Sequence, residues 1–303
     1  MERVTHVLAV DGGGSKTAAA LLTLDGAEVA RCRAGPANLY REPVAGLVEI
    51  ERAWRMLCEL ADINPTVAAP RTVVSAGLAG ASGATQRQAF AAAFAAFAGR
   101  RLSSDGYVAY LGVFGTAPGA MVSIGTGVVA FRCIRGGRPE VRAGWGFPAA
   151  DRGSGAWLGL RLVGEYLDHL DAASPWPDSG PWAAVAGAIG RDREDILGWL
   201  RQARAAEFAT LAPAVVAAAH AGDPLGTELL AEGATHIARL ARAVVAETGG
   251  SLCLAGGLAE TYRPLVGELF ADLLVPPDRK PDPLRGAWLV ATGAAEAEYG
   301  DVA

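Results

Sequence analysis

The chain has 303 residues, of which 51% are hydrophobic and 19% are charged, and its formal net charge is −5. This balance is typical of a well-buried α/β protein and excludes a disordered chain, while the acidic net charge and the absence of long Lys/Arg runs argue against nucleic-acid binding. The four cysteines lack paired spacing, which argues against a disulfide framework, a zinc site or an iron–sulfur site. No run of about 18 apolar residues occurs, so we expect a soluble cytoplasmic protein with no membrane partner.

A glycine-rich loop between two apolar strands is the first expected feature. Residues 7–10 are apolar and residues 18–24 are apolar again, so one strand runs into the loop and another leaves it. Glycines let backbone N–H groups approach an anion, hydroxyls and a lysine add donors, and an acid at the end of the strand can hold a divalent cation through water. The loop consists of Asp11, Gly12, Gly13, Gly14, Ser15, Lys16 and Thr17.

Two familiar phosphate-binding loops do not fit this stretch. A Walker A loop has glycine before its lysine and a helix after it, whereas Ser15 precedes Lys16 and residues 28–33 are extended again after an Asp-Gly turn. A dinucleotide fingerprint likewise opens a helix. A plain glycine hairpin with an incidental acid is the alternative for this loop taken alone.

The rest of the first domain alternates strands with helices. A loop that carries Asn38 and Tyr40 follows the third strand, Pro43 opens a helix that runs to about residue 60, and residues 72–76 form the next strand. A phenylalanine-rich helix comes next and contributes to the core.

Asp105 follows a short strand expected at residues 101–104 and opens a short helix. An acid at the end of a strand is well placed to accept a proton from a substrate hydroxyl. The alternative is that Asp105 is a helix N-cap, because aspartate is among the preferred residues there.

A second set of strands, at residues 120–124, 128–134 and 140–142, repeats the pattern of the first: strand, glycine turn, strand, glycine turn, strand. Its first turn, at residues 125–127 (Gly-Thr-Gly), is followed by a β-branched strand, so it is not a dinucleotide-binding loop. We therefore expect a second domain of similar build to start at residue 117. Two such hairpins could grip a polyphosphate from two sides.

The C-terminal part of the chain offers two further glycine-rich stretches. In the loop at residues 144–155, Asp151 could bind sugar hydroxyls or could cap the helix that starts near Ser154. A pair of glycines after a buried strand could admit a flat base against the backbone. The elements expected after the loop are a helix to about 170, alanine-rich helices at 182–248, a strand at 251–255, a helix at 258–270, a strand at 272–275 and a closing helix at 284–298.

In this order, the motifs resemble those of the N-acetylglucosamine and glucosamine kinases of the BadF/BadG/BcrA/BcrD group, within the actin, hexokinase and Hsp70 superfamily. The resemblance identifies residues 11–17 as the first phosphate motif and implies that the nucleotide is also bound by Gly125, Thr126, Gly127, Gly256 and Gly257. It implies that Asp11 holds Mg²⁺ through water and that Asp105 is the catalytic base. It implies that the sugar is bound by Asn38, Tyr40, Asp105, Gly144, Trp145, Gly146 and Asp151.

The chain departs from the family pattern at three positions. Val128 follows the Gly-Thr-Gly turn where the family usually has a small polar residue, and Arg152 stands where it usually has glutamate. Tyr40 is often tryptophan in animal relatives. None of these departures removes an aspartate assigned to the site.

The resemblance implies an α/β fold of two ribonuclease-H-like (actin-like ATPase) domains with a cleft between them. The expected domains are residues 1–116 and 117–285, with a closing helix at 286–303 that packs back on the first. The implied activity is ATP- and Mg²⁺-dependent phosphorylation of the 6-hydroxyl of an amino sugar, N-acetyl-D-glucosamine or D-glucosamine, by a homodimer. The alternatives are an ATPase activator of a dehydratase, disfavoured because its cluster cysteines are absent, and a non-enzymatic actin-like filament protein.

Overall fold

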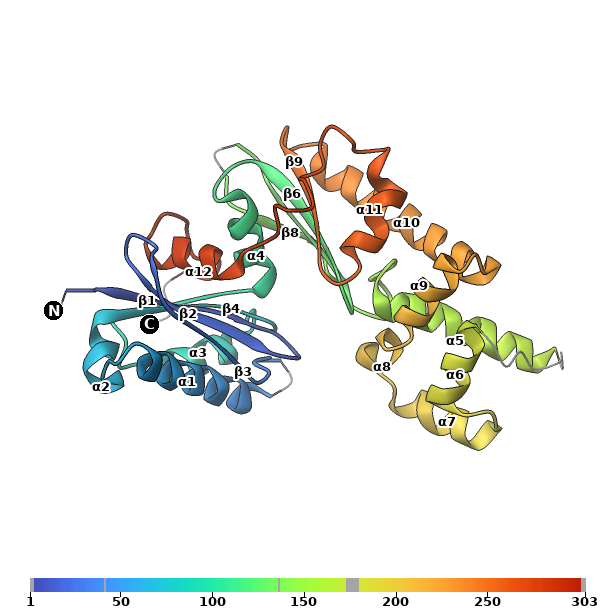
Figure 1. Ribbon diagram of the computed structural model, residues 1–303, viewed down its shortest axis with the longest axis horizontal. Helices are drawn as coiled ribbons and strands as arrows, with labels where there is room; N and C mark the ends of the chain where they lie inside the picture. Colours follow the sequence, from blue (N-terminus) through green and yellow to red (C-terminus); the bar gives the residue numbers. More distant parts are fainter. Residues whose placement is uncertain (1–2, 41, 136, 173–179, 301–303) are drawn as a thin grey trace. The chain divides into compact units, whose positions relative to one another are not determined.

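The computed structural model of the protein describes residues 3–40, 42–135, 137–172 and 180–300. Its contacts divide the chain into two compact units (Figure 1). The chain passes from the first unit to the second at Ala117/Pro118 and returns at Asp278/Arg279, earlier than the boundary expected after residue 285. Unit 1 comprises Met1–Ala117, Gly136–Pro139 and Arg279–Ala303, and unit 2 comprises Pro118–Arg135 and Glu140–Asp278.

Unit 1 is built on a five-stranded mixed sheet with the strand order β3-β2-β1-β4-β5. The expected antiparallel meander is confirmed, and β4 and β5 run parallel to β1, so the carboxyl ends of these three strands lie at one edge of the sheet. β1 reads as a continuous apolar run because both faces of the sheet are covered. The strands are β1 (His6–Gly12), β2 (Thr17–Thr23), β3 (Glu28–Ala34), β4 (Thr72–Leu78) and β5 (Gly99–Ser103).

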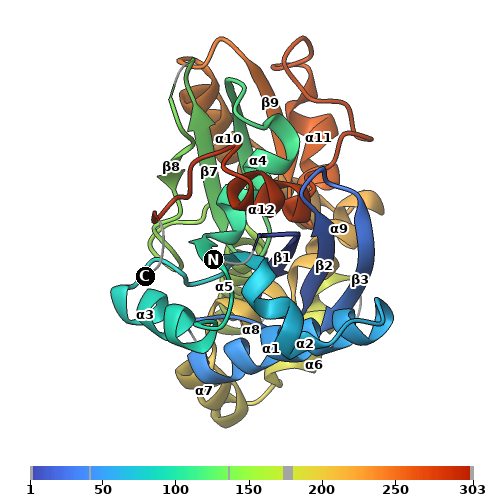
Figure 2. The same ribbon diagram turned by 90° about the vertical axis from the view of Figure 1, so that its left-hand side faces the viewer.

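Helices cover both faces of this sheet (Figures 1 and 2). Leu8 and Val10 of β1 point into a core formed with α1 and α3, while Val7 and Ala9 point into a core formed with α4 and α12. The alternation follows from the two-residue period of a strand. The helical segments of this unit are α1 (Pro43–Leu60), α2 (Pro65–Ala68), a 3₁₀ turn η1 (Ala69–Arg71), α3 (Ala84–Ala93), α4 (Asp105–Phe114) and α12 (Pro283–Ala291).

The closing helix is shorter than expected. α12 ends at Ala291, whereas the sequence suggested a helix to residue 298, and Gly293, which follows the C-cap Thr292, adopts a φ of 74°. A glycine in this left-handed conformation terminates helices because it redirects the chain without a steric penalty. Residues 292–300 therefore run on as an irregular segment, and residues 301–303 of the expected helix lie outside the described residues.

Unit 2 repeats this topology around a four-stranded mixed sheet with the order β8-β7-β6-β9. β6, β7 and β8 form a second antiparallel meander, and β9 runs parallel to β6. The strand expected at 272–275 is only an isolated bridge between Leu252 and Leu274, because the two prolines that follow Val275 have no N–H group to extend a ladder. The strands are β6 (Gly119–Ile124), β7 (Val128–Cys133), β8 (Glu140–Ala143) and β9 (Ser251–Ala255).

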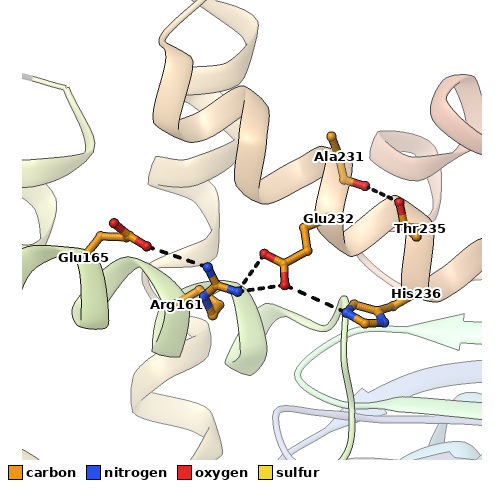
Figure 3. Close-up of polar contacts among 6 residues, drawn as sticks. All are labelled: Arg161, Glu165, Ala231, Glu232, Thr235 and His236. Carbon is orange, nitrogen blue, oxygen red and sulfur yellow. Dashed lines mark hydrogen bonds and ion pairs between the residues drawn. The ribbon is translucent and has the colours of Figure 1, made fainter.

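The helices of unit 2 share one core with its sheet, in which α10 packs on β6 and β7. α10 is also linked to α5 by an ion pair: Arg161 Nη1 lies 2.7 and 2.6 Å from the two carboxylate oxygens of Glu232 (Figure 3). Within α10, His236 Nε2 lies 3.9 Å from Glu232 Oε1. α11 ends at Gly267 rather than at the expected residue 270. The helices are α5 (Gly155–Asp171), α6 (Pro181–Ile189), α7 (Arg193–Gln202), α8 (Ala205–Ala209), α9 (Ala212–His220), α10 (Pro224–Val245) and α11 (Ala259–Gly267).

The hydrophobicity of these helices bears on a possible membrane span. Taken singly, no helix in the described part of the chain combines the length and apolarity needed to cross a bilayer. One bent pair, residues 205–220 with 224–245, meets both criteria jointly, at an angle of 112°.

Candidate functional site

The expected site residues of unit 1 gather at the edge of the sheet where β1, β4 and β5 end. Asp11 is the penultimate residue of β1, and Asp105 begins α4 two residues after Ser103, the last residue of β5. Asn38 reaches this edge through a bridge to Ala79, the residue after β4. Parallel strands bring these positions together although they are far apart in the sequence.

Close packing determines the shape of the glycine loop. A Cβ on Gly12 would lie 2.6 Å from Leu78 Cδ2 and 2.9 Å from Ala37 Cβ, so only glycine fits there. The turn is closed by a hydrogen bond from Gly13 N–H to the Lys16 carbonyl at 3.1 Å. Gly13 and Gly14 carry no comparable packing, which leaves their backbone accessible to a ligand.

Thr17 differs from its expected role in phosphate binding. Its hydroxyl donates a hydrogen bond to the Gly35 carbonyl at 2.7 Å, and the residue is fully buried. The side chain therefore fixes the loop that leads to Asn38. Ser15 and Lys16 are exposed.

The folded protein disfavours the ionised form of the Asp11 carboxyl group. Burial raises its pKa to about 6, with a further contribution from the charge of Asp105, while Lys16 opposes the shift and Asp282 adds to it. Asp282 is the N-cap of α12, where it accepts a hydrogen bond from Arg285 N–H at 3.2 Å. A cation at Asp11 would favour the ionised form.

Asp105 is not the N-cap of its helix. Ser104 holds that position and accepts a hydrogen bond from Tyr107 N–H at 3.3 Å, while Asp105 is the first residue of α4. Asp105 retains solvent access, yet the surrounding protein raises the pKa of its carboxyl, which the N–H of Gly106 partly offsets by donating to Oδ1 at 2.9 Å. The carboxylate is thus free of the capping task.

The residues of unit 1 that the sequence suggests for sugar binding are held by the backbone around them. Asn38 Oδ1 accepts a hydrogen bond from Tyr40 N–H at 2.9 Å, and Leu39 N–H donates to the Ala79 carbonyl at 2.9 Å. Gly80 adopts a φ of 78° and packs directly against Tyr40, where a Cβ would collide. The ring of Tyr40 is 81% exposed, so it is open to a ligand.

In unit 2, the turn at 125–127 is fastened to the start of α5. Gly155 N–H donates to the Gly125 carbonyl at 2.8 Å, and Ala156 N–H donates to the Thr126 carbonyl at 3.1 Å. These bonds satisfy N–H groups that a helix N-terminus otherwise leaves unpaired. Thr126 itself is exposed.

Gly256 and Gly257 lie beside this turn because β9 is parallel to β6. Gly256 has a φ of 88°, and a Cβ there would collide with the Ile124 carbonyl, whereas a Cβ on Gly257 would meet open space. Leu258 N–H donates to the same carbonyl at 3.0 Å. The structure therefore brings together two stretches separated by more than a hundred residues.

A cavity of about 530 Å³ opens between these two stretches. It is large enough for a nucleoside and is mostly apolar. Its far wall comes from α9 and α11, which sequence reasoning missed, because an alanine-rich helix carries no signal beyond core packing. The cavity is lined by Gly125, Thr126, Gly155, Ala209, Ala212, Pro213, Val216, Ala217, His220, Gly257, Leu258 and Thr261.

Asp151 joins the expected sugar loop to the second glycine turn. Its φ is 61°, and burial raises the pKa of its carboxyl while hydrogen bonds from the N–H groups of Val128 and Gly146 lower it. One oxygen, Oδ1, is buried with no hydrogen-bond partner. The helix cap considered as an alternative for Asp151 is Ser154, whose Oγ accepts from Trp157 N–H at 3.1 Å.

The neighbours of Asp151 differ in exposure. Trp145 is 89% exposed, and Gly144 and Gly146 have positive φ angles, so the loop presents an indole to solvent. Arg152 lines a cavity of about 430 Å³ together with Asp151, Gly144 and Val128. Arg152, one of the departures from the family pattern, thus lies beside the expected sugar loop.

The described residues contain no ready-made metal centre: no three His, Cys, Asp or Glu side chains among them are grouped so that they could hold an ion. Mg²⁺ does not require such a cage, because it is commonly bound by one or two carboxylates together with water and substrate phosphates. Asp11 fits this mode, since its largely buried carboxylate lies near the like charges of Asp105 and Asp282. The four cysteines are all buried and free.

Comparisons with known proteins agree over nearly the whole chain. The sequence pattern of the BadF/BadG/BcrA/BcrD ATPase family matches residues 8–291. The chain is 28% identical over 288 residues to the glucosamine kinase GspK of Vibrio cholerae, which covers 95% of this chain and 96% of the relative. It is 30% identical to a solved protein of Chromobacterium violaceum provisionally named N-acetylglucosamine kinase, with a TM-score of 0.81 over 95% of this chain and 99% of that one. A protein of Porphyromonas gingivalis with the same provisional name shares the fold at 19% identity, with a TM-score of 0.67 and the same coverage.

Proposed function

Because this chain belongs to the BadF/BadG/BcrA/BcrD ATPase family, we propose that it is an ATP-dependent kinase that phosphorylates the 6-hydroxyl of an amino sugar. The proposed substrates are D-glucosamine and N-acetyl-D-glucosamine, because these sugars appear in the names of the two relatives at 28% and 30% identity. The single observation that carries the proposal is that Asp11, near the end of β1, and Asp105, at the start of α4 after β5, lie at one edge of the sheet of unit 1, where the charge of Asp105 contributes to the raised pKa of Asp11. Two acids there can divide the tasks of holding a cation and accepting a proton.

The cavity of unit 2 is the proposed adenosine site. Its apolar walls suit a base and ribose, and the backbone of Gly257 is open enough to accept a flat ring. Each unit has a glycine turn whose N–H groups we propose as phosphate donors: the turn at 125–127 in unit 2, and the loop at 12–14 in unit 1, where Ser15 and Lys16 are further donors. Backbone N–H groups in glycine turns bind phosphate because no side chain keeps the anion at a distance.

Asp11 is the proposed Mg²⁺ ligand, acting through water. When bound, Mg²⁺ neutralises charge on the phosphates and helps to align them. Ionised Asp11 is favoured by that cation and disfavoured by burial and by Asp105, so binding of the ion and deprotonation of Asp11 are linked.

Asp105 is the proposed general base. Its Oδ1 is engaged with Gly106 N–H, which orients the carboxylate and leaves Oδ2 to accept the proton of the 6-hydroxyl. As the oxygen of the 6-hydroxyl attacks the γ-phosphorus, its proton passes to Asp105. The bond between the γ-phosphorus and the β,γ-bridging oxygen breaks, and ADP leaves. Desolvation raises the pKa of Asp105 and so makes it a stronger base at neutral pH.

Each unit carries polar groups that we propose for sugar binding. Asn38 and Tyr40 from unit 1, and Asp151 with the loop at 144–146 from unit 2, offer an amide, a phenol, a carboxylate and backbone groups. The unpartnered Oδ1 of Asp151 supports this role, because a buried acceptor without a partner gains free energy when a sugar hydroxyl donates to it.

The two alternatives suggested by the sequence have less support. The match to the glucosamine kinase GspK covers nearly the whole length of both chains. This favours a kinase over a dehydratase activator or a filament protein. A cytoplasmic location is part of the proposal, because ATP is the phosphoryl donor. A homodimer is also proposed, on the resemblance alone, and static light scattering measures it directly.

A coupled assay of ADP release tests the proposal. We expect turnover with glucosamine or N-acetylglucosamine to exceed turnover with glucose, because the site is proposed to recognise the C2 substituent. Phosphorus–proton coupling in the product's NMR spectrum then identifies the 6-position as the phosphorylated one. ADP release that does not depend on any of these sugars would refute the amino sugar kinase.

A further inference from the structure

The irregular segment after α12 returns to the turn that carries Asp105. Ser104 donates two hydrogen bonds to Glu298 Oε2, one from its N–H and one from its hydroxyl, each of 2.7 Å. Two residues earlier in the segment, the Glu296 carbonyl accepts a hydrogen bond from the hydroxyl of Tyr107 at 2.9 Å. Glu298 and Ser104 are 194 residues apart in the sequence, so no local sequence pattern predicts this contact.

Glu298 fixes the residue directly before Asp105. The hydroxyl of Ser104 donates to Glu298 and at the same time accepts from Tyr107 N–H as the N-cap of α4. With its N–H bound to the same carboxylate, Ser104 has both its backbone and its side-chain torsion held in place. The orientation of Asp105 follows, because it is the next residue and begins the helix.

The segment that carries Glu298 is itself anchored. Arg87 of α3 lies over the ring of Tyr299, with 5.3 Å between the guanidinium carbon and the ring centroid. Tyr299 also packs against the core that α1 and α3 share with the sheet. Glu298 thus lies between two anchored residues of this segment, Glu296, whose carbonyl binds Tyr107, and Tyr299.

Placing a charged carboxylate at this position costs free energy, because the group is partly buried and lies near the charge of Asp105. Burial raises the pKa of Glu298, the two bonds from Ser104 and a hydrogen bond with the Tyr299 side chain lower it, and the charge of Asp105 raises it again. A neutral acceptor would meet the needs of Ser104 without repelling Asp105. Charge-assisted hydrogen bonds are shorter and about twice as strong as neutral ones, so what the carboxylate adds is a firmer hold on the turn.

We propose that Glu298 is a positioning residue for phosphoryl transfer: its two hydrogen bonds to Ser104 hold the turn that presents Asp105. This inference rests on the proposed function and names a further residue in the same site. Its role is indirect, since Glu298 acts through Ser104 and not on the substrate. Loss of the bonds leaves Asp105 present but misplaced.

The test compares the kinetics of E298A and E298Q with wild type, with E296A as the matched control. Glu296 is a carboxylate in the same segment, its side chain is exposed, and its contact to Tyr107 uses only the backbone carbonyl, which alanine keeps. We expect E298A to lower kcat by roughly 10- to 100-fold, as when a reacting group is displaced by about 1 Å. We expect KM for ATP to stay near the wild-type value, because Ser104 and Glu298 belong neither to the lining of the proposed adenosine cavity nor to the glycine turns proposed for the phosphates.

The E298Q variant tests whether the hydrogen bonds to Ser104, rather than the negative charge of Glu298, are what turnover requires. The glutamine carbonyl oxygen can accept both bonds from Ser104, so its kcat is expected closer to wild type than to E298A. E296A is expected to match wild type in kcat, KM and Tm. A merely structural role for Glu298 would lower the Tm of E298A and leave kcat per folded molecule unchanged, which would overturn the proposal.

A shortened carboxylate keeps the test decisive if E298A fails to fold. E298D retains the charge but withdraws it from Ser104 by one methylene, so it is expected to lose turnover at near-normal Tm. Wild-type kcat in E298D would overturn the proposal. A wild-type protein that phosphorylates no amino sugar would overturn the proposed function together with this inference, whereas an active wild type with an equally active E298A would overturn this inference alone.

Discussion

Replacing Asp11 with asparagine should stabilise the protein while abolishing its activity. The carboxyl group of Asp11 has its pKa raised from an ordinary 3.8 to about 6, chiefly by burial and then by the charge of Asp105. The folded state therefore binds a proton at Asp11 more tightly than the unfolded chain does. Stability falls as pH rises from about 4 to about 6, and above that range the whole penalty is present.

The size of the effect follows from the shift. A change of about 2 pKa units corresponds to about 3 kcal/mol, at about 1.36 kcal/mol per unit. Asp11 retains some solvent contact, so we expect D11N to gain roughly 1–3 kcal/mol at pH 7.5. Each kcal/mol is worth roughly 2–4 °C in Tm for a domain of this size class.

The assay is the Tm of wild type and D11N from pH 4 to pH 8. We expect the two curves to meet near pH 4 and to separate as pH rises, with D11N the more stable at neutral pH. D25N is the matched control, because the pKa of Asp25 is lowered by hydrogen bonds from the Thr23 hydroxyl and the Ala27 N–H, so its loss should bring no gain. Mg²⁺ with a non-hydrolysable ATP analogue should raise the Tm of wild type more than that of D11N.

Two outcomes would refute this reasoning. An equal or lower Tm for D11N at pH 7.5 would mean that the carboxylate of Asp11 is not under stress in the folded protein. Full kinase turnover in D11N with an ordinary Mg²⁺ requirement would remove Asp11 from the proposed metal site.

Three further predictions concern the base, the sugar and the nucleotide. D105N should keep both substrates bound and lose kcat by roughly 10²–10⁴-fold, the range of general-base catalysis, with little change in Tm because Ser104 caps the helix; a near-normal kcat would leave the proposed reaction without its base. N38A and D151A should each raise KM for the sugar more than KM for ATP, and the reverse pattern would move these residues to the nucleotide. G257V should raise KM for ATP without loss of Tm, because its side chain would enter the cavity, whereas G256A should lower Tm through strain at a φ of 88° and a collision with the Ile124 carbonyl. Equal Tm values for the two glycine variants would contradict the described geometry.

Much of the fold follows from local chemistry. Both meanders were predicted, because alternating apolar runs and glycine turns specify antiparallel neighbours within a few residues. α1 has the bounds expected from Pro43 and its apolar period. The errors lie at the ends of elements: α12 ends at Ala291 instead of residue 298, and 272–275 forms a bridge rather than a strand. Where a helix or strand ends depends on which of its terminal carbonyl groups find hydrogen-bond partners, and those partners lie in other segments of the chain.

The candidate site divides in the same way. Asp11, Asp105 and the glycine turns could be singled out from the sequence, because few residue types combine sharp turns with anion or cation binding. Whether Asp105 was a cap or a free carboxylate could not be read locally, since Ser104 and Asp105 are both good caps. The structure assigns the cap to Ser104, because its hydroxyl is the one that meets Tyr107 N–H.

The sequence by itself determined the order of the elements and the residue types at the strand ends. Only the tertiary structure decided the raised pKa of Asp11, the wall that α9 adds to the cavity of unit 2, and the contact of Glu298 with Ser104. The physical reason is that turns and periodicities act between neighbours in the chain, whereas desolvation, cavity shape and long-range hydrogen bonds depend on segments that meet only after the sheets and helices have packed.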